Sequence, residues 1–157
     1  MDLFDLSRYG PDLHHYAVLA SSVVVEWQGG GSMIINRLQR KIVIVLDTGL
    51  TGCIFHDSLA TELEKKFGTD TVKGIQVNVR TDSGSTLTLA SNPDYWRLDC
   101  FHLPWFYEDQ TDTREDNTPS RAPHIIAVGA TIWTGVKSLT IDTTSRRAII
   151  DLKQCSE

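Results

Sequence analysis

The segment best suited to chemistry is Asp47-Thr48-Gly49, which directly follows the apolar run 42–46. A carboxylate beside a hydrophobic core is costly unless it is hydrogen-bonded or used in a reaction. Gly49 allows a sharp turn and a close approach by another segment. The hydroxyl groups of Thr48 and Thr51 can hydrogen-bond to backbone or carboxylate atoms. The pattern therefore indicates either a carboxylate used in acid–base catalysis or an ordinary Asx-type turn after a buried strand.

Other catalytic patterns are weaker. The five histidines, at positions 14, 15, 56, 102 and 124, show no HExxH spacing, and no Gly-x-Ser-x-Gly elbow is found. Cysteines at positions 53, 100 and 155 form neither a CxxC pair nor a disulfide framework. We expect no metal site and no cofactor. We also expect His14 and His15 to be solvent-exposed, His56 to lie on the surface at a helix start, and Cys53 to pack as a small apolar side chain.

Composition favours one globular domain without a nucleic-acid or membrane partner. The chain has 157 residues, 41% of them hydrophobic, and a formal net charge of −5 with no basic run. Nucleic-acid binding of the sequence-independent kind needs clustered Lys and Arg. The start of the chain lacks the pattern of a signal peptide, and the longest apolar run is far too short to span a bilayer. We therefore expect a soluble, cytoplasmic protein.

The pattern of apolar residues predicts a mainly β protein with two short helices. Predicted strands cover residues 16–27, 33–35, 41–46, 74–80, 85–90, 124–128, 139–141 and 147–152, with a further extended run over 95–106. Helices are predicted over 57–67 and for a short turn from Gly129 to Trp133. Residues 1–19 are interpreted as an N-terminal arm, 20–157 as the domain, and the acidic stretch 108–119 as a surface loop. Such short strands favour a closed or partly closed barrel.

Three segments resemble the retropepsin-like aspartic proteases. IVIVLDTGLTGCIF, from Ile42, resembles their active-site strand and loop, in a form similar to a prokaryotic subgroup with a DTGLTG loop. HIIAVG, from His124 to Gly129, resembles the strand that threads beside that loop, and SLTIDTTSRRAIIDL resembles the last hairpin. The family commonly has Ala at the position of Leu50, and Arg, Asn or Asp at that of Ala130.

The resemblance implies an aspartic endopeptidase with an acid-protease barrel. Asp47 would be the catalytic residue, and Thr48, Gly49 and Thr51 would complete the active-site loop. Substrate contacts would come from Leu50, a flap at Ser83-Gly84-Ser85, Val128 and Gly129. Because the chain has one such motif and the chemistry needs two carboxylates sharing a proton, a homodimer would join Asp47 to its symmetry mate and cleave peptide or protein substrates. The alternative is an inactive dimeric module of the same fold that binds peptides or serves in assembly.

Overall fold

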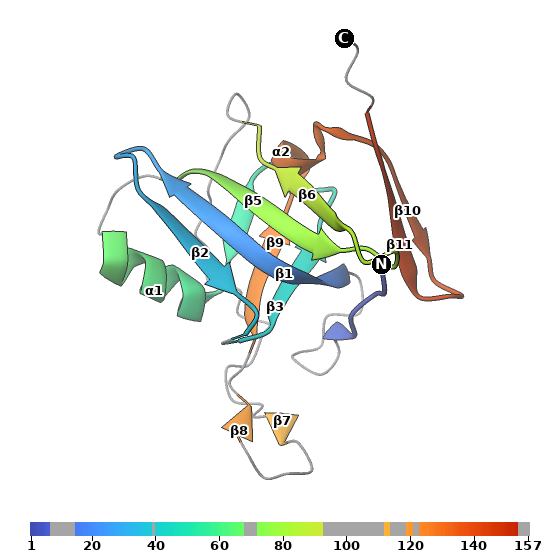
Figure 1. Ribbon diagram of the computed structural model, residues 1–157, viewed down its shortest axis with the longest axis horizontal. Coiled ribbons are helices and arrows are strands. Elements are labelled where there is room, and N and C mark those ends of the chain that lie inside the picture. Colours follow the sequence, from blue (N-terminus) through green and yellow to red (C-terminus); the bar gives the residue numbers. More distant parts are fainter. Residues whose placement is uncertain are drawn as a thin grey trace.

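The computed structural model describes residues 1–6, 15–38, 40–67, 72–92, 112–113, 119–120 and 123–153. Over these residues the chain is mainly β-structure with two short helices (Figure 1). The strands are β1 (Tyr16–Trp27), β2 (Ser32–Asn36), β3 (Ile42–Leu46), β4 (Cys53–Phe55), β5 (Val72–Arg80), β6 (Thr86–Ala90), β7 (Asp112–Thr113), β8 (Pro119–Ser120), β9 (His124–Val128), β10 (Val136–Asp142) and β11 (Arg147–Leu152). The helices are α1 (Asp57–Phe67) and α2 (Ala130–Trp133).

One curled sheet forms the body of the molecule. Its strand order is β4-β9-β3-β1-β5-β6, with β2 also paired to β1. All of its pairs are antiparallel except β3 with β9. The hairpin β10–β11 stands beside the open edge of this half-barrel, and α1 lies at the opposite side (Figure 1). The separate pair β7–β8 makes a third, two-stranded sheet.

Strand β1 is the longest strand and changes its facing pattern midway. Its pairing with β5 shifts register between Ala20 and Ser22, which leaves Ser21 as an extra residue. A bulge of this kind moves the following side chains to the opposite parity. Side chains on both halves of β1 therefore enter the same core: Val18, Ala20, Val23, Val25 and Trp27.

Strands β3 and β9 are buried on both faces, as the unbroken apolar run in β3 predicts. One face of the pair packs into the main core, which includes Ile44 and Ile126. The other face carries Val43, Val45, Ile125 and Ala127 in a second cluster with Leu6 and Ala17. A parallel pair needs a long crossover connection, and residues 47–123 provide it.

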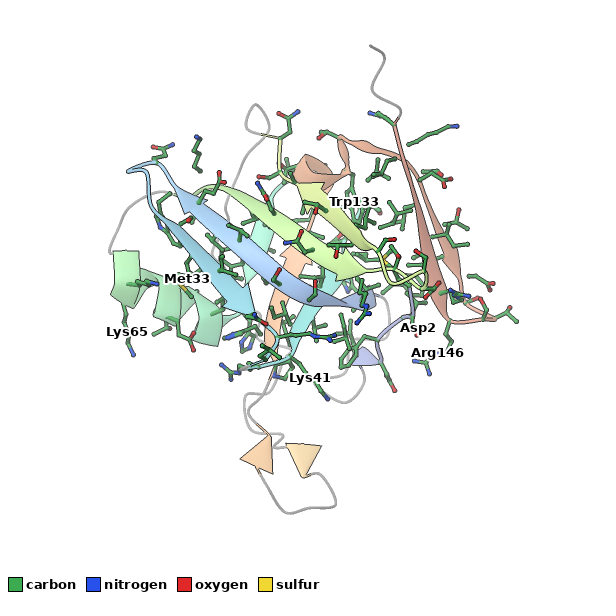
Figure 2. All side chains as sticks on the ribbon, in the orientation of Figure 1. Asp2, Met33, Lys41, Lys65, Trp133 and Arg146 are labelled. Carbon is green, nitrogen blue, oxygen red and sulfur yellow. The ribbon has the colours of Figure 1, made fainter. Side chains whose placement is uncertain are left out.

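The first six residues pack against the fold. Phe4 forms an antiparallel bridge with Ala17 of β1, and Asp2 forms one with Arg147 of β11. Asp2 accordingly lies near Arg146 at one end of the β10–β11 hairpin (Figure 2). The predicted arm extends to residue 19, whereas β1 begins at Tyr16 and residues 1–6 are tied to β1 and β11.

The predicted elements that fall on described residues agree with the structure in type and order, but the short strands β4, β7 and β8 were not predicted, and β7 lies in the stretch 108–119 expected to be a loop. The strand over 16–27, the helix over 57–67 and the final strand over 147–152 have the predicted bounds, while β5 and β10 begin earlier than predicted. The half-barrel sheet confirms the mainly β fold class with two short helices. The predicted extended run 95–106 lies outside the described residues, as does most of the acidic stretch 108–119. Among the described residues, no helix is both long and apolar enough to cross a membrane.

Two histidines are buried where α1 meets β9. His56, expected on the surface, is 6% exposed. Its backbone N–H donates to the carbonyl of Ile125 (3.0 Å), and this bond holds the start of α1, and His56 with it, against β9. The expectation of a surface position was therefore wrong. His124 is equally buried; its Nε2 lies 3.9 Å from Glu62 Oε2, and its Nδ1 has no hydrogen-bond partner in the part that the structure describes.

The pKa of His124 is lowered from 6.5 to about 4, chiefly by burial and then by the positive charge of Arg40, while Glu62 opposes the shift. The unfolded chain therefore takes up a proton first as the pH falls. The free energy of unfolding should drop by about 3 kcal/mol between pH 6.5 and pH 4 on account of this residue alone. Urea midpoints of the wild type and His124→Leu, measured across this range, test the effect. The variant should lose less stability on acidification, and equal losses would contradict the assignment.

Candidate functional site

The carboxylate of Asp47 is held at the end of a buried strand. The backbone N–H of Asp47 donates to the carbonyl of Val128 (3.1 Å), which extends the pairing of β3 with β9 by one residue. Its Oδ1 accepts hydrogen bonds from the N–H groups of Gly49 (2.9 Å) and Leu50 (3.2 Å). This is the Asx-type turn that the sequence left open. The turn occupies Oδ1 and leaves Oδ2 directed away from the loop's own N–H groups.

A second segment clamps the loop from behind. The N–H groups of Gly129, Ala130 and Thr131 donate to the carbonyls of Gly52 (2.8 Å), Leu50 (2.6 Å) and Thr51 (3.0 Å), respectively. These three consecutive backbone hydrogen bonds hold the loop in a fixed position relative to the sheet. The same arrangement places β9 between β3 and β4, the two strands that flank the loop.

Gly129 is required for this approach. A Cβ atom on Gly129 would overlap the carbonyl of Leu50 and would lie only 2.7 Å from the carbonyl oxygen of Gly52. These are backbone atoms of the clamped loop, so they cannot move aside without breaking its hydrogen bonds. The residue that ends the segment HIIAVG must therefore be glycine for steric reasons.

The tip of the loop faces outward. Thr48, Gly49 and Thr51 are exposed, and Leu50 is half-buried against the second apolar cluster. The Asp47 side chain is 28% exposed. The exposed Thr48 hydroxyl makes no hydrogen bond to any residue in the described part of the chain. A carboxylate and a hydroxyl are thus presented together at the surface of one chain.

His15 lies beside Asp47, which the sequence did not predict. Its Nε2 is 3.6 Å from Asp47 Oδ2, and its side chain is 31% exposed. His15, expected to be solvent-exposed, is only partly exposed because it lies against Asp47, while His14 lies outside the described residues. His15 and Asp47 come together because the strand that begins at Tyr16 pairs with the strand that ends at Leu46. The sequence does not show which strands pair, so this contact could not be predicted.

The remaining predicted site residues fall into two groups. Val128 is fully buried in the main core and supports the loop through its carbonyl oxygen. Ser83, Gly84 and Ser85 are exposed in the turn of the β5–β6 hairpin, where Gly84 takes a positive φ of 83°. The N–H of Thr81 closes this turn on the carbonyl of Ser85 (2.9 Å).

The turn of the β5–β6 hairpin contacts the β10–β11 hairpin and the N-terminus. The carboxylate of Asp82 contacts the guanidinium of Arg147 and lies 3.5 Å from the amino group of Met1. A hollow of about 410 Å³ lies beneath it, and Leu87 and Ile150 help to line it. Figure 1 shows the end of β5–β6 beside β11 and the N-terminus. Within the described residues, no hydrogen bond or ion pair joins this turn to the loop 47–52.

Cys53 is structural. It is completely buried beneath the loop, and burial raises its pKa to about 12, although the N–H of Gly129 acts in the opposite direction. The thiol therefore stays protonated at neutral pH and packs as a small apolar side chain, as predicted. In the part of the chain that the structure describes, no cluster of His, Cys, Asp and Glu is arranged to hold a metal ion.

Neither a scan against protein-family models nor a search of the curated proteins gives a match to this chain.

Gly129→Ala should dislodge the loop that carries Asp47. The added methyl group meets backbone on two sides, so we expect a loss of about 3 kcal/mol in the free energy of unfolding, at the upper end for overpacking. Gly135→Ala is the matched control, because a Cβ atom there meets nothing within 4 Å. Chemical denaturation of both variants measures the difference. Equal stabilities of the two variants would show that the close contact at Gly129 does not constrain the loop.

Proposed function

We propose that the chain is one subunit of a homodimeric aspartic peptidase with a retropepsin-like fold, which hydrolyses peptide bonds in peptide or protein substrates. The observation that carries the proposal is the held carboxylate of Asp47. It is fixed by a buried strand, by two N–H donors of its own loop and by the clamp from Gly129 to Thr131, yet it remains partly exposed. A structural turn alone would not require this second layer of support from β9.

The order of the strands supports the finer fold assignment. Strand β9 passes between the strands that enter and leave the Asp47 loop, as expected from the resemblance of HIIAVG to the threading strand of the family. Helix α2 then follows at Ala130, and the hairpin β10–β11 closes the described chain. These features are the ones that the resemblance to a retropepsin-like subunit leads us to expect, and they support the proposal.

Hydrolysis would use two Asp47 carboxylates, one from each subunit. One carboxylate accepts a proton from a water molecule while the other, protonated, polarises the scissile carbonyl. The attacked carbon becomes tetrahedral as the protonated carboxyl gives its proton to the carbonyl oxygen. As the C–N bond breaks, the carboxyl that took the water's proton passes it to the leaving nitrogen, and the other carboxylate takes a proton back from one hydroxyl, which gives an amine and a carboxylic acid and restores the singly protonated pair. One chain supplies only one of these carboxylates, that of Asp47, so the second must come from a partner copy. The exposed loop tip, with Thr48 and Gly49, is the surface through which a partner loop would be met.

The hairpin β5–β6 would serve as the flap over a bound peptide. Its turn is exposed, and Gly84 gives it the left-handed conformation that side chains disfavour. Residues Ser83 and Ser85 would offer backbone and hydroxyl groups to the substrate. Contact between Asp82 and Arg147 holds the turn against β11. Movement of the flap toward the loop would therefore break this contact.

Asp47→Asn tests the catalytic assignment. The change keeps the shape of the side chain and its Oδ1 acceptor but removes the carboxylate, so we expect cleavage to fall by about a thousandfold or more while the fold is retained. A fluorogenic peptide with apolar residues on both sides of the cut measures the rate. Asp142→Asn is the control, since Asp142 forms a similar Asx-type turn in the β10–β11 hairpin. Undiminished cleavage by Asp47→Asn would exclude the mechanism.

Sedimentation tests the requirement for a partner. Active protein should sediment at twice the mass of one chain, since two-fold dimers are the simplest closed assembly that pairs one residue with itself. An active monomer would contradict the proposed dyad. A stable dimer without cleavage would instead favour a peptide-binding or assembly module.

The pH profile tests the sharing of a proton. Two carboxylates in contact titrate as a pair, and only the singly protonated pair is active. Activity should therefore follow a bell with its optimum below neutrality, be blocked by a statine-type inhibitor and be insensitive to a chelator. The stability loss expected from His124 at acid pH requires that each rate be corrected for folded protein. A rate that rises steadily to alkaline pH would indicate different chemistry.

A further inference from the structure

The register of β1 and β3 places His15 across the sheet from Asp47. The last recorded partners of the two strands are Tyr16 and Leu46, and the next residues along each chain are His15 and Asp47. Directly opposed residues of antiparallel strands have neighbouring side chains on the same face. The contact of Nε2 with Oδ2, at 3.6 Å, follows from this register.

The imidazole faces the carboxylate oxygen that the loop does not hold. Oδ1 of Asp47 already accepts two N–H donors, from Gly49 and Leu50. Oδ2 lies against His15. A protonated imidazole would pair with this oxygen as an ion, and a neutral ring with hydrogen on Nε2 would direct a donor toward it. In both states the ring lies against Oδ2, the oxygen that a water molecule or a second carboxylate would need in the proposed dyad.

His15 is held by its place at the start of β1. It continues directly into the strand at Tyr16, and the pairing of Tyr16 with Leu46 sets the register. Ala17 is fixed in turn by the N–H of Phe4, which donates to its carbonyl (2.7 Å). The ring is therefore presented to Asp47 by the framework of the sheet.

We propose that His15 is a built-in inhibitory contact of Asp47 that restrains the peptidase activity proposed above, on which this inference rests. The imidazole competes with the water and with the partner carboxylate for Oδ2. Substrate cleavage requires the ring to move aside. The free form of the subunit is thereby held less active than the same site without the ring.

Among the residues that the structure describes, Asp5 is a second acidic group near this end of β1. It lies one residue beyond the bridge between Phe4 and Ala17, near the start of β1. The phenol of Tyr16 is the adjacent titratable group on the strand itself. A test must therefore separate the effect of Asp47 on His15 from that of Asp5.

The first measurement is cleavage of a fluorogenic peptide by His15→Phe, which keeps a flat ring but removes both nitrogens. We expect kcat/KM to rise about two- to fivefold, the range of a partly exposed ion pair. His15→Ala should show the same direction if the larger ring perturbs the fold. Tyr16→Phe is the matched control and should leave kcat/KM unchanged. Unchanged or slower cleavage by both His15 variants, with an active wild type, would overturn the proposal.

The second measurement does not depend on activity. Diethyl pyrocarbonate modifies accessible imidazole nitrogens, and mass spectrometry gives the rate at His15. Asp47→Asn should speed this modification about two- to fivefold, as expected when an ion pair of this strength is lost. Asp5→Asn should change it less. A larger effect of Asp5→Asn would assign the imidazole to Asp5 and overturn the proposal.

The two measurements distinguish the failure of this proposal from failure of the proposed function. Cleavage that depends on Asp47 but not on His15 leaves the peptidase standing and removes the inhibitory contact. An inactive wild type with active His15 variants would support both. Inactivity of the wild type and of every His15 variant would overturn both, whatever the labelling rates show.

Discussion

The parallel pairing of β3 with β9 is the constraint on which the rest of the structure depends. It buries both strands on both faces and brings the end of β9 under the loop that follows β3. Because Gly129 has no side chain, its segment can donate three consecutive hydrogen bonds to that loop. The position of Asp47 is therefore set by long-range packing, and the loop sequence alone would not hold it there.

This constraint explains why a carboxylate can be both ordered and accessible. Cys53 and Val128 are completely buried below the loop and support it from the core. Above it, Asp47 and Thr48 reach the surface. Buried support beneath and exposure above are what a positioned catalytic group requires. His15, brought in by the register of β1, adds a restraint from the same sheet.

Local patterns predicted the elements well, and the contacts between distant segments poorly. The apolar run 42–46 and the stripe of Leu59 and Leu63 act over short distances, so β3 and α1 could be inferred from neighbouring residues. The burial of His56 could not be, because it depends on the packing of α1 on β9. His15 was missed for the same reason: its partner is more than thirty residues away, and only the strand pairing joins them. Asp47 could be singled out from the sequence because its motif is contiguous, and its catalytic role stays a prediction.

A crystal structure of the protein with a statine-type inhibitor is the decisive experiment for the proposed Asp47 pair. We expect a two-fold dimer in which the Asp47 carboxylates of both subunits lie within hydrogen-bond distance of the inhibitor's hydroxyl group, with His15 displaced from Oδ2. Loops that carry Asp47 on separate faces of the assembly, or an inhibitor bound elsewhere, would contradict it.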